Sequence, residues 1–157
     1  MKKIGEYTAR GIVTEVDTEG GNPQLVHLFD GRFNTAYRIT EFKIWAASYD
    51  SSSAPDCIGK LSKNPDGVKS NASFMRADDD NQIAWATSAG SLDGGLGFGD
   101  SIVDPDNLVV EDLYVYARTS GTSTNAINYL IIMEKYDITE ARGALTMARD
   151  RAQGDIL

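Results

Sequence analysis

Side chains that most catalytic and metal sites require are scarce in this sequence. Its 157 residues include one cysteine, Cys57, and one histidine, His27. A single cysteine excludes an internal disulfide and a cysteine cluster for zinc, so we interpret Cys57 as a reduced structural thiol. His27 lies in the apolar run LVHLF, which predicts a half-buried strand histidine. Because the chain also lacks a G-x-S-x-G motif, it offers no nucleophile–base pair for catalysis.

Positive charge and long apolar runs are scarce as well. The 15 lysines and arginines are outnumbered by 23 acidic residues, which gives a net charge of −8 and argues against a basic surface that wraps nucleic acid. No apolar run reaches the length of about 20 residues that spans a bilayer. The start, MKKIGEYTARG, lacks the apolar core of a secretion signal. We therefore expect folding in the cytoplasm, without contacts to membrane or direct contacts to nucleic acid.

What the sequence does contain is a series of short strand patterns separated by turns. The hydrophobic content of 41% predicts one globular domain, residues 1–157, with a sizeable core. The pattern indicates a mainly β fold, an antiparallel β-sandwich of jelly-roll type, with one carboxyl-terminal α-helix at about 138–153. The stretches 48–73 and 88–100 are expected to be loops. The strands are expected at 7–16, 24–29, 36–47, 82–87, 108–117 and 126–136.

Two of these strands carry further expectations. In 36–47 the apolar alternation changes phase between Ile39 and Phe42, which predicts a bulge or a bend. The run 126–136 is apolar on both parities, which is typical of a strand covered on both faces. We expect it to pair with 108–117 in the centre of the fold, across a hairpin loop.

The helix begins at Asp137 or at Thr139, since either side chain can accept hydrogen bonds from first-turn amides. Small and apolar residues at spacings of three and four form one narrow stripe along it. Its members are Ile138, Ala141, Leu145, Ala148 and Ala152. Two interpretations stay open: the stripe docks the helix on its own sheet, or the helix reaches a neighbouring subunit.

Carboxylates are plentiful, but their spacing does not match a known site. The clusters 78–81 and 104–107 do not follow the calcium-loop pattern and are interpreted as solvated acidic turns. Glu111 and Asp112 are neighbours in a predicted strand, so their side chains should face opposite ways and not share a glycosidase-type site. The sequence therefore predicts no metal and no cofactor.

Glycines and tryptophans complete the search for binding residues. The loop Gly90–Gly99 contains GLGFGD but lacks the lysine of a phosphate-binding P-loop, and is interpreted as a surface loop. Trp45 and Trp85 sit among small apolar residues, which favours core packing over a sugar-binding platform.

The carboxyl-terminal third carries a resemblance. The segments IVDPDNLVVEDLYVYAR and INYLIIMEKYDIT, with the helix ending GALTMARDRAQ, resemble the carboxyl-terminal part of structural proteins encoded by marine bacteriophages. The resemblance implies a capsid component of the virion, made in the host cytoplasm, that assembles with copies of itself and other virion proteins and has no enzymatic activity. A coat protein that touches the genome usually presents a basic arm, whereas this chain starts with only Lys2, Lys3 and Arg10. That departure favours an outer or decorating position.

If the helix does reach a neighbouring copy, we expect it to do so through Ala141, Leu145, Ala148 and Arg149. Two rival functions remain open. One is a β-sandwich binding module for glycans or a host surface, using Trp45, Trp85 or the long loops. The other is a carboxylate enzyme built on Glu111 or Asp112.

Overall fold

The computed structural model describes residues 1–14, 23–47, 55–65, 72, 75–90, 99–119 and 126–156. Within these ranges the chain forms eight strands and one helix. The elements are β1 (Lys2–Val13), β2 (Gln24–Val26), β3 (Thr35–Ala46), β4 (Cys57–Ser62), β5 (Gln82–Ser88), β6 (Gly99–Val103), β7 (Leu113–Thr119), β8 (Ile127–Asp137) and α1 (Glu140–Ile156). None of the described helical segments is long and apolar enough to cross a membrane.

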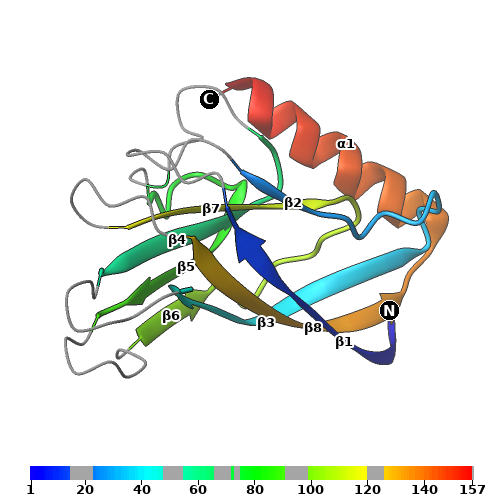
Figure 1. The fold of residues 1–157 in the computed structure, drawn as a ribbon. Coiled ribbons are helices and arrows are strands. Elements are labelled where there is room, and N and C mark those ends of the chain that lie inside the picture. The colour runs from blue at the N-terminus through cyan, green and yellow to red at the C-terminus, as the bar shows by residue number, and fades with distance from the viewer. Residues whose placement is uncertain are drawn as a thin grey trace.

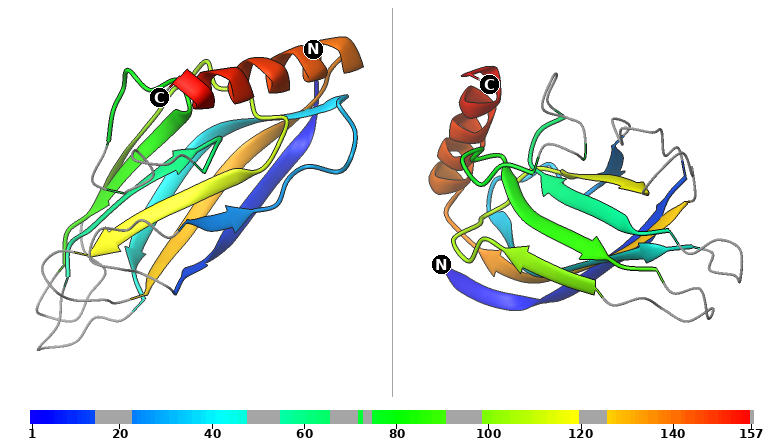
Figure 2. Two further views of the ribbon diagram at one scale, coloured as in Figure 1. Left: turned by 90° about the horizontal axis from the view of Figure 1, so that it is seen from above. Right: turned by 90° about the vertical axis from the view of Figure 1, so that its left-hand side faces the viewer.

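The strands form two antiparallel sheets that pack face to face, with α1 along one side (Figures 1 and 2). One sheet has the order β1-β8-β3 and the other the order β2-β7-β4-β5-β6. The mainly β sandwich with a carboxyl-terminal helix that the sequence predicted is confirmed.

Strand pairing is nested in the manner of a jelly roll. The first strand pairs with the last, β2 pairs with β7, and β4 pairs with β5. In a fully rolled arrangement β3 would pair with β6. Here β6 pairs with β5 instead, and a cavity of about 260 Å³ lies between β3 and β6, lined by Lys43, Ile44 and Trp45 on one side and by Gly99, Asp100 and Ser101 on the other.

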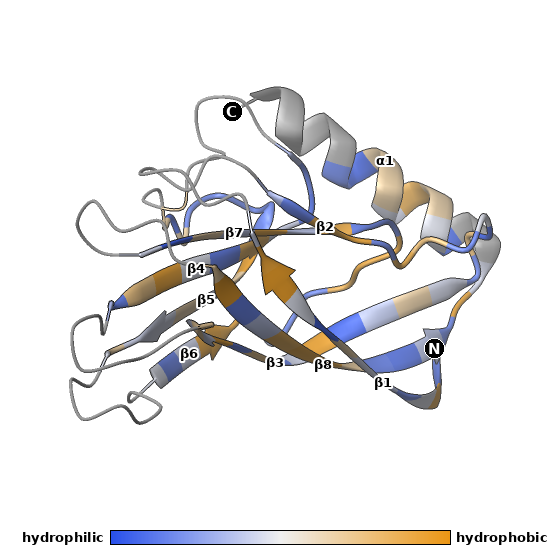
Figure 3. Ribbon diagram, viewed as in Figure 1, coloured by the Kyte–Doolittle hydropathy of each residue, from blue (hydrophilic) through white to orange (hydrophobic). Residues whose placement is uncertain are grey.

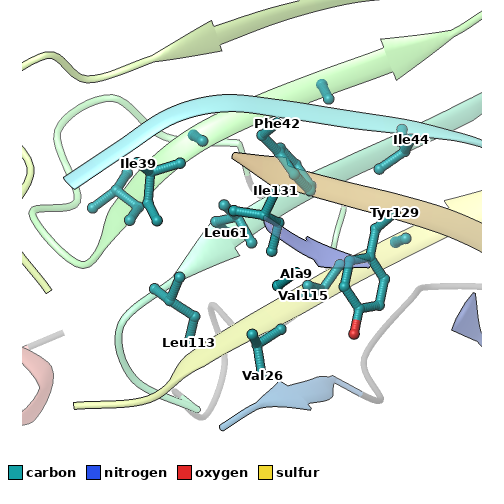
Figure 4. Close-up of a cluster of buried hydrophobic side chains, with 14 of the residues drawn as sticks. Ala9, Val26, Ile39, Phe42, Ile44, Leu61, Leu113, Val115, Tyr129 and Ile131 are labelled. Atoms are coloured by element: carbon teal, nitrogen blue, oxygen red, sulfur yellow. The ribbon is translucent and has the colours of Figure 1, made fainter. Parts of the chain in front are cut away.

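The core lies between the sheets. Alternate residues of each strand point inward, because successive side chains of a strand face opposite sides. Figure 3 shows the resulting interleaving of hydrophobic and hydrophilic residues along the strands. Phe42 and Ile131 from one sheet meet Leu61 and Val115 from the other, and all four side chains are fully buried (Figure 4).

The bulge predicted in the third strand is confirmed. The register of β3 against β8 shifts between Ile39 and Glu41. Since one extra residue reverses which parity faces the core, Ile39 is buried before the shift and Phe42 is buried after it. The hydroxyl of Thr40 donates to the backbone carbonyl of Ile132, 3.1 Å away.

The expected pairing of 108–117 with 126–136 is wrong. β7 and β8 belong to different sheets, so the chain crosses the sandwich between them. β7 begins only at Leu113, and the preceding residues lie along β3, where Val109 and Tyr37 exchange backbone hydrogen bonds of 2.8 Å. β8 is also not covered evenly, since its burial alternates between buried and half-buried residues. An apolar pattern indicates a strand but does not predict which strand it pairs with.

One strand lies inside a stretch that was expected to be a loop, 48–73, and another, β6, begins at the end of the second such stretch, 88–100. β4 is central in the five-stranded sheet, between β7 and β5, and β6 forms its edge. β4 reads CIGKLS, and its Gly59 faces the core where a β-carbon would come within 3.0 Å of both the Ile44 side chain and the Tyr116 carbonyl. Close packing therefore requires glycine in a strand whose composition is a weak strand signal.

Candidate subunit-contact surfaces

The helix α1 has one buried and one exposed face. Gly143, Met147 and Asp150 are buried, at spacings of four and three residues that place them on one side of the helix. Met147 packs in a small cluster with Ala36, Val110, Tyr136 and Ile138. The expectation that the alanine-rich stripe docks the helix is wrong for Leu145 and Ala148, which are exposed.

The start of the helix lies against the backbone of the loop before β3. A β-carbon at Gly143 would overlap the carbonyl oxygen of Phe33, so no larger residue fits there without a shift of backbone. The amide of Ile138 donates to the carbonyl of Asn34, 2.9 Å away. Thr139 caps the helix, with its hydroxyl oxygen 3.3 Å from the amide of Arg142, whereas Asp137 is the last residue of β8.

Farther along, a buried ion pair holds the helix to the end of β4. Nζ of Lys63 lies 3.2 Å from Oδ1 of Asp150, and both side chains are less than a tenth exposed. The side-chain amide of Asn64 donates to the backbone carbonyl of Asp150 at 2.8 Å and to Oδ1 of Asn81 at 3.1 Å. Burial raises the pKa of Asp150, and the attraction of Lys63 only partly offsets that effect.

The exposed face carries three of the four predicted contact residues. Leu145 is 72% exposed, and Ala148 and Arg149 are exposed beside it. The side chain of Ala141 lies outside the described residues. Ala148 and Arg149 lie three and four residues after Leu145, on the side of α1 away from the sandwich. A large apolar side chain is therefore presented on a helix that is anchored at two points.

A second exposed surface is the strand β1, at the edge of the three-stranded sheet (Figure 2). It spans Lys2 to Val13 and carries three large exposed side chains. Ile4 is 53% exposed, Tyr7 48% and Ile12 40%. Sequence analysis placed this strand at 7–16 and did not single it out, since its edge position depends on the pairing of the whole chain.

The opposite edge of the same sheet is closed at the β3 bulge. The buried side chain of Asn107 accepts from the amide of Ile39 at 2.7 Å and donates to its carbonyl at 3.0 Å. The same side-chain amide donates to the carbonyl of Asp104 at 2.6 Å. Asn107 thus takes the place of a neighbouring strand, and Val109 continues that pairing beside Tyr37.

The acidic clusters at 78–81 and 104–107 are hydrogen-bonded turns, and neither is solvated throughout. Asp79 is buried, and its carboxylate accepts from the amide of Asn81 at 3.0 Å and the side chain of Gln82 at 3.2 Å. Asp104 accepts from the amide of Asp106 at 3.0 Å. In the part of the chain that the structure describes, no group of three metal-ligating side chains forms.

The carboxylate of Asp112 also accepts hydrogen bonds from backbone amides. Its Oδ1 accepts from the amides of Leu28 at 2.8 Å and Phe29 at 2.9 Å, which fixes the chain after β2. Nδ1 of His27 lies 3.1 Å from the same oxygen, but the His27 side chain is 74% exposed, so the expected half-buried strand histidine is wrong.

The expectation that Glu111 and Asp112 cannot share a site is wrong as well. Both residues precede β7, where strand alternation does not apply, and both line a cavity of about 250 Å³. Lys63, Asn64 and Tyr114 complete that cavity. Because the Asp112 carboxylate already accepts two backbone hydrogen bonds, its place in the fold is structural.

The two tryptophans lie on different outer faces. Trp45 stands between the core residues Ile44 and Ala46, and Trp85 between Ala84 and Ala86, so each points away from the core of its own sheet. Both are half-buried, and the expected core packing is wrong. Since they belong to opposite sheets, they cannot form one platform.

The last two expectations concern Cys57 and the glycine loop. Cys57 is buried, and burial raises the pKa of its thiol to about 11, in keeping with a reduced structural thiol. Residues 91–98 lie outside the described residues, and Gly99 begins β6.

Comparison of the chain with protein-family models and with curated proteins finds no match.

Proposed function

We propose that this protein is a non-enzymatic structural component of a bacteriophage virion, a coat or decoration protein that assembles in many copies. The observation that carries the proposal is the exposed face of α1. Leu145 is 72% exposed there, on a helix held by the Gly143–Phe33 contact and the Lys63–Asp150 pair. A single exposed leucine is common on protein surfaces, and Leu145 supports the proposal because it lies on the helix face that the sequence pattern predicts to contact another copy.

The fold and the polar groups support the same proposal. Jelly rolls form the shells of many viruses, although a fold alone does not assign a function. Asp79, Asn107 and Asp112, which stood out as candidates for chemistry, are engaged with nearby amides and carbonyls. Their roles are explained by the architecture of the domain.

The test is self-association of purified protein, measured by size-exclusion chromatography with light scattering and by negative-stain microscopy. The wild-type chain should form discrete oligomers whose size depends on concentration. Leu145→Glu should shift them toward smaller species, because a charge at the centre of the contact must be desolvated. Ala144→Glu adds the same charge at an exposed position on the flank of the helix and should change assembly less.

A wild-type chain that stays monomeric at every concentration would contradict self-assembly. If Leu145→Glu forms oligomers as well as the wild type does, the protein self-assembles but α1 is not part of the contact.

A binding module for glycans or a host surface is the second candidate, and Trp45 favours it. Trp45 lines both the 260 Å³ cavity beside β6 and a shallower one of about 660 Å³ that includes Arg10, Ile12 and Asn128. An aromatic ring beside polar groups can stack on a sugar. Saturable quenching of tryptophan fluorescence by a glycan, lost in Trp45→Ala and retained in Trp85→Ala, would establish this function; no response to a broad glycan panel would exclude it.

A further inference from the structure

The two edges of the three-stranded sheet differ. At β3, Asn107 and Val109 occupy the hydrogen-bonding groups of Ile39 and Tyr37. At β1, no strand of the described chain pairs with the edge that faces away from β8. A long edge strand with exposed apolar side chains is a template for pairing with another chain.

Lysines and a bulge, two features that protect such edges, lie at the start of β1. Lys2 and Lys3 are there, and the register against β8 shifts between Lys3 and Gly5, at Ile4. From Gly5 to Val13 the pairing with β8 runs without interruption. Lysines and bulges discourage edge pairing, and this stretch has neither; its two charged residues, Glu6 and Arg10, have opposite signs.

The sequence of the strand is nearly its own mirror image. Residues 4–12 read I-G-E-Y-T-A-R-G-I. Counted outward from Thr8, isoleucine matches isoleucine, glycine matches glycine, and Glu6 is at the same distance from the centre as Arg10. The strand is therefore complementary, in shape and in charge, to an antiparallel copy of itself.

We propose that β1 pairs with β1 of a second copy of this chain, antiparallel, around a two-fold axis through Thr8. The inference deepens the self-association proposed above and rests on it, and it adds a surface independent of α1. The two three-stranded sheets then become one continuous sheet across the dimer. Opposite residues are Gly5 with Gly11, Glu6 with Arg10, and Thr8 with Thr8 of the second copy.

Charge selects this register. A two-fold axis perpendicular to the sheet keeps the core-facing and outer residues of both strands on matching sides. Moving the axis two residues toward the amino terminus would set Glu6 against Glu6, and moving it two residues the other way would set Arg10 against Arg10. Like charges directly opposite one another destabilise a strand pair, whereas opposite charges and aliphatic pairs stabilise it.

The side chains are free to make these pairs. Glu6, Thr8, Arg10 and Ile12 are exposed and lie on the outer face, since Tyr7 and Ala9 are paired with the buried Met133 and Ile131. Arg10 has no ion-pair partner among the described residues. Glu6 lies 3.1 Å from Lys3, but Lys3 has a second acceptor in Glu134 at 3.3 Å and is not left alone if Glu6 turns to Arg10.

The experiment is disulfide trapping with Thr8→Cys in the full chain. Opposite residues of an antiparallel pair have Cα atoms about 4.5–5.5 Å apart, which a disulfide spans. The matched control is Arg10→Cys, on the same strand and face, because residues 10 of the two copies would lie four positions apart along the strands, about 13 Å. Cys57 is buried in both variants and in the wild-type chain.

Under mild oxidation, Thr8→Cys should give a covalent dimer, seen on non-reducing gels, and Arg10→Cys and wild type should not. If the chain oligomerises in light scattering but the two variants cross-link equally or neither does, the β1 pairing is overturned and self-assembly stands. If the wild-type chain is monomeric and Thr8→Cys does not cross-link, both proposals fail.

A charge reversal tests the register without a cysteine. Glu6→Arg should weaken the dimer at least about tenfold, because it places two like-charged pairs across the axis. The double change Glu6→Arg with Arg10→Glu restores opposite charges and should recover the affinity. Equal weakening by the single and double variants would overturn the register.

Discussion

Nζ of Lys63 and Oδ1 of Asp150 lie 3.2 Å apart, and they join the residue after β4 to the second half of α1. Both side chains of the pair are less than a tenth exposed. Removal of the pair therefore tests how firmly the helix is held.

Replacing Asp150 with alanine should destabilise the protein by about 1–3 kcal/mol, because the buried Lys63 ammonium loses its hydrogen-bond acceptor, which a protonated Asp150 would still supply. Chemical denaturation monitored by circular dichroism measures the loss. The double variant Lys63→Met with Asp150→Leu removes both charges and should recover most of it. If the double variant is as unstable as the single one, packing and not the uncompensated charge explains the loss.

The pH dependence of Asp150 follows from its burial. Burial raises the pKa of the carboxyl above its ordinary value of 3.8, so in the range between 3.8 and the raised value the folded chain holds more protons than the unfolded chain. Stability contributed through this group therefore rises as pH falls through that range. The measurement is the difference in unfolding free energy between the wild type and Asp150→Asn. As pH falls through that range, this difference should change in favour of the wild type. A change in the opposite direction would show that attraction by Lys63 outweighs desolvation.

Gly143→Ala should destabilise the chain, although alanine is the better helix former by about 1 kcal/mol. The added methyl would meet the carbonyl oxygen of Phe33, and displacing that backbone costs roughly 1–3 kcal/mol. Thermal or chemical unfolding measures the change. The reverse substitution at the exposed neighbour, Ala144→Gly, should cost about 1 kcal/mol through helix propensity alone. A stabilised Gly143→Ala would contradict the contact.

Asn107→Asp separates the donor and acceptor roles of one buried side chain. A carboxylate can still accept from the amide of Ile39 but cannot donate to the carbonyls of Ile39 and Asp104. We expect a loss of roughly 2–4 kcal/mol, because buried acceptors are left unsatisfied and a charge is buried. Hydrogen exchange should remain slow at the Ile39 amide in Asn107→Asp and become fast in Asn107→Ala. Equal exchange rates in both variants would contradict the hydrogen bond from the Ile39 amide to the Asn107 side chain.

The sequence predicts most of the strands and the helix, but it predicts much less of how they pair and pack. The phase change between Ile39 and Phe42 located the bulge because it is a local pattern. The pairing of β7 was missed because Asn107 and Asp112 act on residues far away in the sequence, at Ile39 and Leu28. β4 was missed because Gly59 and Lys60 give a weak strand signal, and only packing makes the strand central.

For the contact surfaces as well, local patterns were predicted from the sequence and long-range contacts were not. Leu145 and Ala148 were singled out from their spacing, and Arg149 was added as a charged residue beside that stripe. The structure places all three on the exposed face, while their contact with another copy stays a prediction. The buried face was missed, although a glycine inside a helical pattern is a signal of close packing. The self-complementary order of residues 4–12 is visible in the sequence, but only the pairing of β1 shows that it lies at an edge.

The nesting of the strands has a consequence for synthesis of the chain. Among the described strands, β1 is synthesised first and β8, its hydrogen-bonding partner, is synthesised last. At a translation rate of roughly 5–20 residues per second, β1 waits several seconds before β8 is available to pair with it. Contacts so distant in sequence make folding of this domain slow. During that wait both edges of β1 are open, so high local concentrations on a polysome favour association between nascent chains.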